Sequence, residues 1–218
     1  LAGSFDVSSE GSPQSVTFND DGARMFMTHF GDKVHQYNLT TAYDITTASL
    51  TSSFDVTLDF DKSEDVAFNN DGKSMFMVGF QTNAVRQYGL STGFDLSTAF
   101  GPVANFSTNS RRTVAFNDTG ALMFIGGPNS DSIDQYTLGT NFDITTASFN
   151  SFFDVSSEDT FSQCVTFNSA GTRMFLVGNN TVSIYQYNLS TPFDITTASP
   201  TDSFDVSSDD NNPQGLAF

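Results

Sequence analysis

The sequence predicts an all-β fold, a β-propeller whose blades are four-stranded antiparallel sheets. Three observations lead to this prediction. A unit of about fifty residues recurs four times, each unit contains four strand-like segments separated by turn residues, and the second segment is apolar on both faces. We expect blades at residues 14–56, 64–107, 112–155 and 163–206, with a partial blade at each end, in a single domain spanning residues 1–218.

The repeat is defined by three phrases that return in the same order. The first, SVTFNDDGARMFM at residues 15–27, has a valine that recurs at intervals of 50, 48 and 51 residues. The second contains Gln-Tyr followed by a phrase close to FDITTAS, and its tyrosines are residues 37, 88, 136 and 187. The third is SFDV or a variant of it. Such regular spacing indicates one supersecondary unit repeated along the chain.

Alternation and turn chemistry place the strands within the first unit. Residues 15–19 read as the first strand, and the following Asn-Asp-Asp-Gly predicts a hairpin turn in which Gly22 takes positive φ. Residues 24–29 and 34–39 read as the second and third strands, and the fourth lies within 49–56. No helical period persists for ten residues, so the sequence favours strands throughout.

The second strands favour a propeller over a sandwich or a β-helix. Met25, Phe26 and Met27 are consecutive apolar residues, so both faces of this strand need cover. A blade stacked between two neighbouring blades provides that cover, and a period near fifty is much longer than a β-helix coil. We therefore expect the phenylalanines at the centres of the four second strands to occupy equivalent buried sites between blades. They are Phe26, Phe76, Phe124 and Phe175.

The two ends carry incomplete units. The N-terminal SFDV would supply only a fourth strand, and the C-terminal PQGLAF only a first strand. Because a blade without its middle strands has unpaired edges, we expect self-association or a longer parent chain that closes the ring. A four-blade ring with two loose ends is the alternative.

The pattern within Val16–Asp44 resembles the YVTN-type and lactonase-like repeat of bacterial and phage β-propellers. The features that carry the resemblance are an apolar strand, Asn-x-Asp-Gly, Met-Phe-Met, a short loop and Val-x-Gln-Tyr, and all four units match. The units here are longer than is usual in that family, through the FDITTAS connection. The resemblance implies a propeller, and it implies no single activity, since such repeats occur in surface proteins, phage structural proteins, binding scaffolds and some enzymes.

Composition excludes several classes of partner. The chain has 25 acidic residues against 8 lysines and arginines, for a formal net charge of −17, so it repels polyanions and we expect no nucleic-acid partner. No run of eighteen apolar residues is present, and we expect no membrane insertion. The single cysteine, Cys164, has no intramolecular disulfide partner, and its repeat position predicts an inert residue lining the axial channel.

Candidate ligand-binding residues lie in the loops that differ between units. In a propeller, the loops from the fourth strand to the next first strand and from the second strand to the third gather on one face, which we call the loop face. Divergence there fits a binding surface, and it also fits simple freedom of exposed loops. The candidates are Asp59, Asp61, Glu64, Arg111, Arg112, Asn129, Asp131, Asn179 and Asn180.

We predict no metal site, no cofactor and no catalytic residues. The acidic loop 59–65 has alternate carboxylates, but it lacks a full set of calcium ligands and contains Lys62. The aspartates of the FDI and FDV phrases recur in nearly every unit, which is typical of residues that cap turns. His29 and His35 occur in one unit only and have no nucleophile nearby in the sequence.

These observations favour a non-enzymatic recognition or structural module. We expect it to be extracellular or on a virion surface and to bind a glycan or a protein through the loop face. The alternative is a lactonase-like or glycan-cleaving enzyme, which would need a metal or a pair of carboxylates converging on the axis from different blades.

Overall fold

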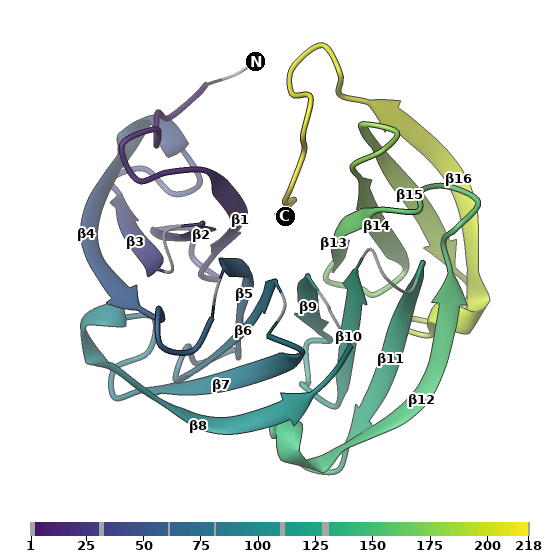
Figure 1. Ribbon diagram of the computed structural model, residues 1–218, viewed down its shortest axis with the longest axis horizontal. Helices are drawn as coiled ribbons and strands as arrows, with labels where there is room; N and C mark the ends of the chain where they lie inside the picture. The colour runs from purple at the N-terminus through teal and green to yellow at the C-terminus, as the bar shows by residue number, and fades with distance from the viewer. Residues whose placement is uncertain are drawn as a thin grey trace.

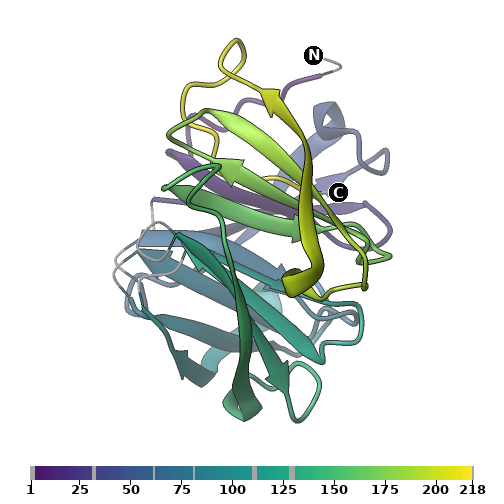
Figure 2. The same ribbon diagram turned by 90° about the vertical axis from the view of Figure 1, so that its right-hand side faces the viewer.

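The computed structural model describes residues 3–30, 33–60, 62–80, 82–109, 112–127 and 131–217. Within them the chain forms four antiparallel sheets of four strands, each ordered as in the sequence. Figure 1 shows the sheets arranged around a central axis, with the first strand of each innermost and the fourth outermost. Figure 2 shows the arrangement from the side of the last sheet, with its outermost strand in front. The predicted all-β propeller of four-stranded antiparallel blades is confirmed.

The strands of each blade follow one another directly. Blade 1 contains β1 (Pro13–Phe18), β2 (Arg24–His29), β3 (Lys33–Leu39) and β4 (Ala48–Asp55). Blade 2 contains β5 (Lys62–Phe68), β6 (Ser74–Phe80), β7 (Ala84–Leu90) and β8 (Ala99–Ser107). Blade 3 contains β9 (Thr113–Phe116), β10 (Leu122–Gly127), β11 (Ser132–Leu138) and β12 (Ala147–Asp154). Blade 4 contains β13 (Ser162–Phe167), β14 (Arg173–Gly178), β15 (Ser183–Leu189) and β16 (Ala198–Asp205).

A tight turn joins the first and second strands of each blade. In blade 1, Gly22 has φ +67° and donates its N–H to the carbonyl of Asn19, and the Asn19 side chain accepts from the N–H of Arg24. A Cβ at Gly22 would lie 2.3 Å from the ring of Tyr43, so a glycine is required here both by backbone conformation and by space. This confirms the turn that the sequence predicts.

A short 3-10 helix joins the third and fourth strands of each blade. These helices are η1 (Ile45–Thr47), η2 (Leu96–Thr98), η3 (Ile144–Thr146) and η4 (Ile195–Thr197). Asp44 begins η1 and accepts hydrogen bonds from the N–H of Thr46 at 3.1 Å and from its hydroxyl at 2.6 Å. The same cap recurs at η2, η3 and η4, so these aspartates stabilise the connection as predicted. None of the described helices is long enough to cross a membrane.

The FDV aspartates also act locally. Asp55 accepts from the N–H of Thr57 at 2.9 Å, and Asp6, Asp154 and Asp205 accept in the same way from the serine two residues on. The hydrogen bonds from this Ser or Thr lower the pKa of each carboxyl from its ordinary value. These residues therefore order the exit from the fourth strand.

Blades are held together by stacked phenylalanines. Phe26 of blade 1 is fully buried, with its ring centroid 4.5 Å from that of Phe68 in blade 2 and 6.2 Å from that of Phe94. Phe76 and Phe124 are also fully buried and make the same pair of contacts with the next blade. For these three residues the predicted site between blades is confirmed.

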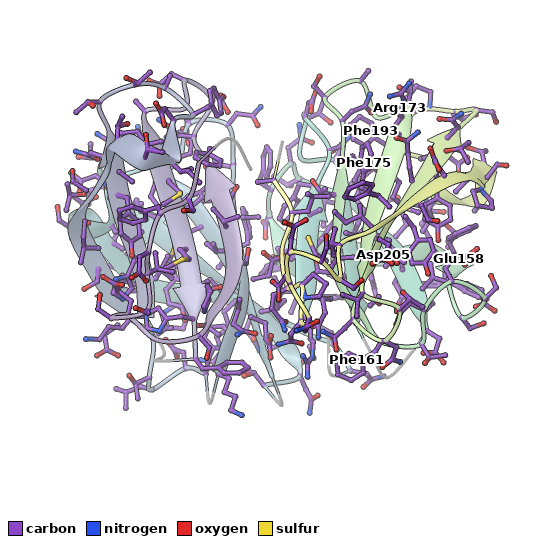
Figure 3. The ribbon with its side chains drawn as sticks, turned by 90° about the horizontal axis from the view of Figure 1, so that it is seen from above. Glu158, Phe161, Arg173, Phe175, Phe193 and Asp205 are labelled. Carbon is purple, nitrogen blue, oxygen red and sulfur yellow. The ribbon has the colours of Figure 1, made fainter. Side chains whose placement is uncertain are left out.

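Phe175 differs from this prediction. It holds the equivalent position in β14 of blade 4, but its side chain is only half-buried (Figure 3). The physical reason is its place in the row, because no further complete blade in the described chain packs on this face of blade 4. The Met-Phe pair of the second strand occurs in all four units, but the cover that the next blade provides does not.

The two end segments pack as parts of a further blade. Phe5 contacts Tyr37 edge to face, with centroids 5.4 Å apart, as Phe54 contacts Tyr88 at 5.5 Å between blades 1 and 2. At the other end, a Cβ on Gly215 would lie 3.1 Å from the Cα of Ser15. The N-terminal segment thus lies where a preceding fourth strand would lie, and the C-terminal segment lies at the axis as a first strand would.

We predict that Phe76→Ala lowers the free energy of unfolding by about 3–5 kcal/mol, because it removes a fully buried ring from between two blades. Phe175→Ala, at the same repeat position, should cost clearly less because its ring is partly solvated already. Urea titrations followed by circular dichroism would measure both. Equal losses for the two variants would contradict this account of the blade interface.

Candidate functional site

The residues that approach the axis come from the starts of the first strands. A β-bulge falls between residues 13 and 15 of β1, 63 and 65 of β5, and 162 and 164 of β13, so one extra residue is inserted at each site. The inserted position and its counterparts in blade 3 and the C-terminal segment form a set that we call the axial polar ring. Its members are Gln14, Glu64, Arg112, Gln163 and Gln214.

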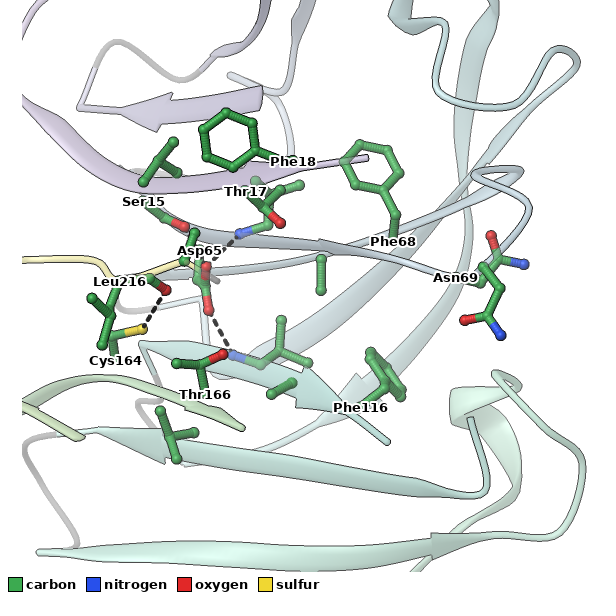
Figure 4. A pocket seen from close by; sticks show the side chains of 18 of the residues that line it. Ser15, Thr17, Phe18, Asp65, Phe68, Asn69, Phe116, Cys164, Thr166 and Leu216 are labelled. Carbon is green, nitrogen blue, oxygen red and sulfur yellow. Dashed lines mark hydrogen bonds between the residues drawn. The ribbon is translucent and has the colours of Figure 1, made fainter. Parts of the chain in front are cut away.

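Below this ring, Asp65 of β5 joins the blades through a buried network. Its Oδ1 accepts from the hydroxyl of Ser15 in blade 1 at 2.5 Å and from the N–H of Val66 at 2.8 Å. Its Oδ2 accepts from the hydroxyl of Thr113 in blade 3 at 3.0 Å and from the N–H of Val114 at 2.9 Å (Figure 4). Burial raises the pKa of Asp65, and these four hydrogen bonds oppose that effect.

The network reaches blade 4 through Thr113. The N–H of Val165 in β13 donates to the hydroxyl of Thr113 at 3.1 Å, while that hydroxyl donates to Asp65. All four first strands are thereby connected through one carboxylate. Because both oxygens of Asp65 are occupied by donors from the protein, its role is structural.

Cys164 lines the same axial region and is buried. Its thiol donates to the carbonyl of Leu216 at 3.8 Å, and burial raises its pKa to about 12. A thiol with so high a pKa carries almost no thiolate at neutral pH, so it is a poor nucleophile. Cys164 therefore lines the axial region as predicted.

A pocket of about 230 Å³ lies beside this network (Figure 4). It is lined by the first strands of all four blades and by the C-terminal segment, with Phe18, Phe68 and Phe116 among its apolar residues. Its carboxylates are Asp20, Asp65 and Asp118, of which Asp65 is fully hydrogen-bonded. In the part of the chain that the structure describes, no group of three or more metal-ligating side chains is present.

Glu64 and Arg112 meet in the axial polar ring. Glu64 is only 4% exposed, and its Oε1 lies 3.8 Å from Nη1 of Arg112 without a hydrogen bond from any described residue. Burial raises the pKa of Glu64 to about 7, and the charge of Arg112 opposes the shift. Arg112 also donates to Oε1 of Gln163 at 3.0 Å and lies 4.8 Å above the ring of Phe161. Contacts from blades 2, 3 and 4 therefore converge at this point.

Gln14 continues the ring on the side of blade 1. It is 4% exposed, and its amide nitrogen donates to the carbonyl of Pro13 at 2.9 Å. Its Oε1 is buried and has no hydrogen-bond partner among the described residues. Next to it, an opening of about 450 Å³ lies between blade 1 and the C-terminal segment, lined by Phe30, Asp210 and Gln214 among others.

Asp59, another predicted site residue, is engaged within the protein. One of its oxygens is paired with Arg86 of β7, and the other accepts from the hydroxyl of Tyr88 at 2.8 Å. The guanidinium of Arg86 also lies 5.5 Å from the ring centre of Phe60. Asp59 thus fixes the loop between β4 and β5 to the next blade, an interaction that the sequence did not indicate.

The remaining predicted residues lie in the outer loops of this face. Asp131 has φ +47° and accepts from the N–H of Val155 at 2.8 Å through its carbonyl. Asn179 donates to the side chain of Asn212, and Asn180 donates to the hydroxyl of Thr160 at 2.9 Å. The other three predicted residues, Asp61, Arg111 and Asn129, lie outside the described residues.

The structure therefore brings together Glu64 and Arg112 out of the predicted set and leaves Asp59, Asp131 and Asn180 apart from them. Sequence reasoning missed Gln14 and Gln163. A signal for them was present, since both stand two residues before the repeated first-strand valine, at the same place as Glu64 and Arg112. Without the bulges, nothing in the alternation of the strand indicates that this position approaches the axis.

Known structures share this architecture. A protein of unknown function from Desulfotomaculum acetoxidans aligns over 89% of this chain and 56% of its own length, at 13% identity and a TM-score of 0.58. A candidate 6-phosphogluconolactonase from Bacteroides fragilis aligns over 94% and 59%, at 14% identity and a TM-score of 0.58. A protein from Lactobacillus plantarum aligns over 94% and 57%, at 16% identity and a TM-score of 0.55.

These similarities concern the fold. The neighbours include lactonase-like β-propellers, in agreement with the resemblance of the repeat, and the chain spans less than three fifths of the length of each. No protein-family model and no curated protein matches the sequence.

We predict that Asp65→Asn destabilises the protein by about 2–4 kcal/mol, because the amide nitrogen must face donors that now bond to a carboxylate oxygen. The matched control is Asp118→Asn, at an exposed turn residue of the same charge, which should change the free energy of unfolding little. Urea unfolding of the two variants is the measurement. An Asp65→Asn protein as stable as the control would rule out the network as a link between blades.

Glu64 should make stability depend on pH. Its pKa of about 7 lies above the ordinary value of 4.5, so the folded state holds this proton more tightly than the unfolded state. Its contribution is fully present below pH 4.5 and is lost as pH rises through 7. Glu64→Gln should therefore leave stability nearly unchanged at pH 4.5 and raise it by about 3 kcal/mol at pH 8.

Thermal unfolding at the two pH values would test this prediction. The substitution also introduces the residue that the first and fourth units carry, Gln14 and Gln163, so the site tolerates it sterically. A stability gain of the same size at both pH values would show that the proton on Glu64 is not the cause.

Proposed function

We propose that this chain is a non-enzymatic recognition module that binds a glycan or a protein through the loop face, with the axial polar ring at its centre. The observation that carries the proposal is the convergence of Glu64, Arg112 and Gln163, from three different blades, beside the ring of Phe161. Polar side chains from separate elements that meet at one point can give a ligand several placed contacts at once.

The chemistry of the axial polar ring suits a hydroxyl-rich ligand. Glutamine amides both donate and accept, and the ring holds Gln14 and Gln163 beside the charged pair. Phe30, which is 41% exposed, lines the adjacent opening, and Phe161 lies under Arg112. Aromatic faces with a few placed polar groups are typical of specific ligand sites. The net charge of −17 favours neutral or cationic ligands over anionic ones.

The proposal includes display outside the cell or on a virion surface. It is supported by the scarcity of lysine and arginine and by the abundance of serine, threonine and asparagine in the loops. Under this proposal the four blades provide a rigid frame, and the loops that diverge between units provide the specificity.

A lactonase-like hydrolase is the second candidate, and one observation favours it. The pKa of Glu64, about 7, lies where a general acid or base is effective. Its neighbour in the ring is the cation Arg112, however, and the nearby carboxylate of Asp65 has both oxygens occupied by donors from the protein, so it is not free to act as the second carboxylate of a glycoside-cleaving pair. We therefore place binding ahead of catalysis.

A glycan array together with capture of defined glycoproteins would test the proposal. We expect a glycan class that binds the unmodified chain and binds the double variant Phe161→Ala, Gln163→Ala at least about tenfold more weakly, a loss of about 1.4 kcal/mol. Lys73→Ala is the control, since Lys73 is exposed in a turn on the opposite face.

Two results would contradict the proposal. One is binding that survives the double variant but is lost in Lys73→Ala. The other is turnover of a lactone or glycoside that disappears in Glu64→Gln while the fold remains intact, which would establish the hydrolase instead.

A further inference from the structure

The outer face of blade 4 exposes an aromatic residue that is covered in every other blade. Phe204 of β16 is 65% exposed. Its counterparts Phe54, Phe106 and Phe153 are half-buried, and each contacts a tyrosine of the next blade edge to face at 5.5, 5.1 and 5.4 Å. An aromatic pair of this kind is therefore the regular contact between fourth strands and the following blade.

The rest of this face shows the same pattern. Phe175, labelled in Figure 3, is half-buried, whereas Phe26, Phe76 and Phe124 are fully buried. Ile184 of β15 is also half-buried, whereas its counterparts in the other three blades are fully buried. Blade 4 thus presents the surface that blades 1, 2 and 3 present to their neighbours.

Blade 1 presents the complementary surface on its opposite face. Tyr43 is 53% exposed, whereas its counterparts Phe94, Phe142 and Phe193 lie 6.2 to 6.4 Å from the central phenylalanine of the preceding blade. An opening of about 500 Å³ adjoins it, lined by Gly3 and by residues 42–45.

Hydrogen bonds from a backbone N–H to a glutamine of the preceding blade also indicate that this face of blade 1 is uncovered. At the start of η2, the N–H of Leu96 donates to Oε1 of Gln36 in the preceding blade at 2.8 Å. At the start of η4, the N–H of Ile195 donates to Oε1 of Gln135 at 3.1 Å. Ile45 holds this position in η1, and no glutamine of a preceding third strand lies there among the described residues.

The segments that would flank two further strands are already docked between these faces. Phe5 packs on Tyr37 as a fourth-strand phenylalanine does, and the C-terminal segment lies at the axis against both Cys164 and Ser15. Figure 1 shows the N-terminal segment, from residue 3, and the C-terminal segment, up to residue 217, between blade 1 and blade 4, with the C-terminal segment running toward the axis. A second and a third strand would complete a sheet there.

We propose that the faces of blades 4 and 1 form one docking site for a β-hairpin that carries the pattern of this chain's own second and third strands. The occupant has a phenylalanine at the centre of one strand, which stacks on Phe18 and Tyr43 as Phe26 stacks on Phe68 and Phe94. Its other strand has Gln-Tyr, with the glutamine accepting from the N–H of Ile45 and the tyrosine covering Phe204. The interface is continuous with the three that already join the blades.

The test adds such a hairpin to the chain. A copy of residues 168–189 is fused after Phe218, because residues 168–189 follow Phe167 at the equivalent point of blade 4. The matched control carries the same extension with Phe175→Ser and Tyr187→Ser in the copy. Hydroxyl-radical footprinting with mass spectrometry measures the side-chain exposure of Phe204 and Tyr43, and light scattering measures the mass.

With the hairpin, we expect the oxidation rate of Phe204 to fall to that of Phe54 in the same sample, and the rate of Tyr43 to fall well below its value in the unextended chain. Phe152, which is 61% exposed elsewhere, should keep its rate. The extended protein should be monomeric and unfold at a higher temperature than the unextended chain, and the control extension should change neither property.

Three results would overturn the proposal. The first is unchanged oxidation of Phe204 and Tyr43 in the extended protein. The second is equal protection by the control extension, which would mean that any added chain covers these faces. The third is an unextended chain that forms a stable oligomer in which both residues are already protected, because the occupant would then be a second copy of the chain.

Discussion

Every blade of this protein is a sheet that is apolar on both faces, and this single constraint determines the architecture. A sheet of this kind is stable only when another layer covers each side, so the blades must stack in a row. The stacking is specific because the central phenylalanines of β2, β6 and β10 each lie between two aromatic rings of the next blade. A twist between successive blades curves the row around an axis. The apolar faces at the two ends of the row are not covered by a further complete blade, as the faces between blades are.

Bending the row brings together residues that are far apart in the sequence. Ser15, Asp65 and Thr113 lie about fifty residues apart along the chain, yet one carboxylate binds to all of their strands. A buried carboxylate is tolerated only where enough donors surround it, and here each neighbouring blade supplies some of them. The units are thus alike where blades stack and different where they approach the axis, which is where one copy must complement another.

The sequence predicted the parts of the structure that depend on local chemistry. Gly22 in its turn, Asp44 at its cap and Phe26 between blades each follow from a few neighbouring residues and the period of the repeat. Phe175 could not be distinguished from Phe26 in this way, because its exposure depends on what lies beyond blade 4. The ion pair of Asp59 with Arg86 also could not be predicted from the sequence, since it depends on how a loop folds against the third strand of another blade.

The axial polar ring shows why the site was only partly predicted. Glu64 and Arg112 could be predicted as site residues because they are charged, whereas Gln14 and Gln163 carry no charge and resemble ordinary surface residues. Their shared position becomes meaningful only in the structure, where β-bulges at Gln14, Glu64 and Gln163 interrupt the alternation of the first strands.

Three members of the axial polar ring are glutamines, and the other two positions hold Glu64 and Arg112. The carboxylate and the guanidinium of these two residues lie 3.8 Å apart. The two charges cancel when Glu64 is ionised, so above the pKa of about 7 the ring is as neutral as a ring of five amides would be. Below that pKa it carries the charge of Arg112 alone, at the centre of a chain with a net charge of −17. Under the proposed recognition function, a change of pH through this range would therefore alter the charge that the ring presents to a ligand, while the frame that holds the ring stays the same.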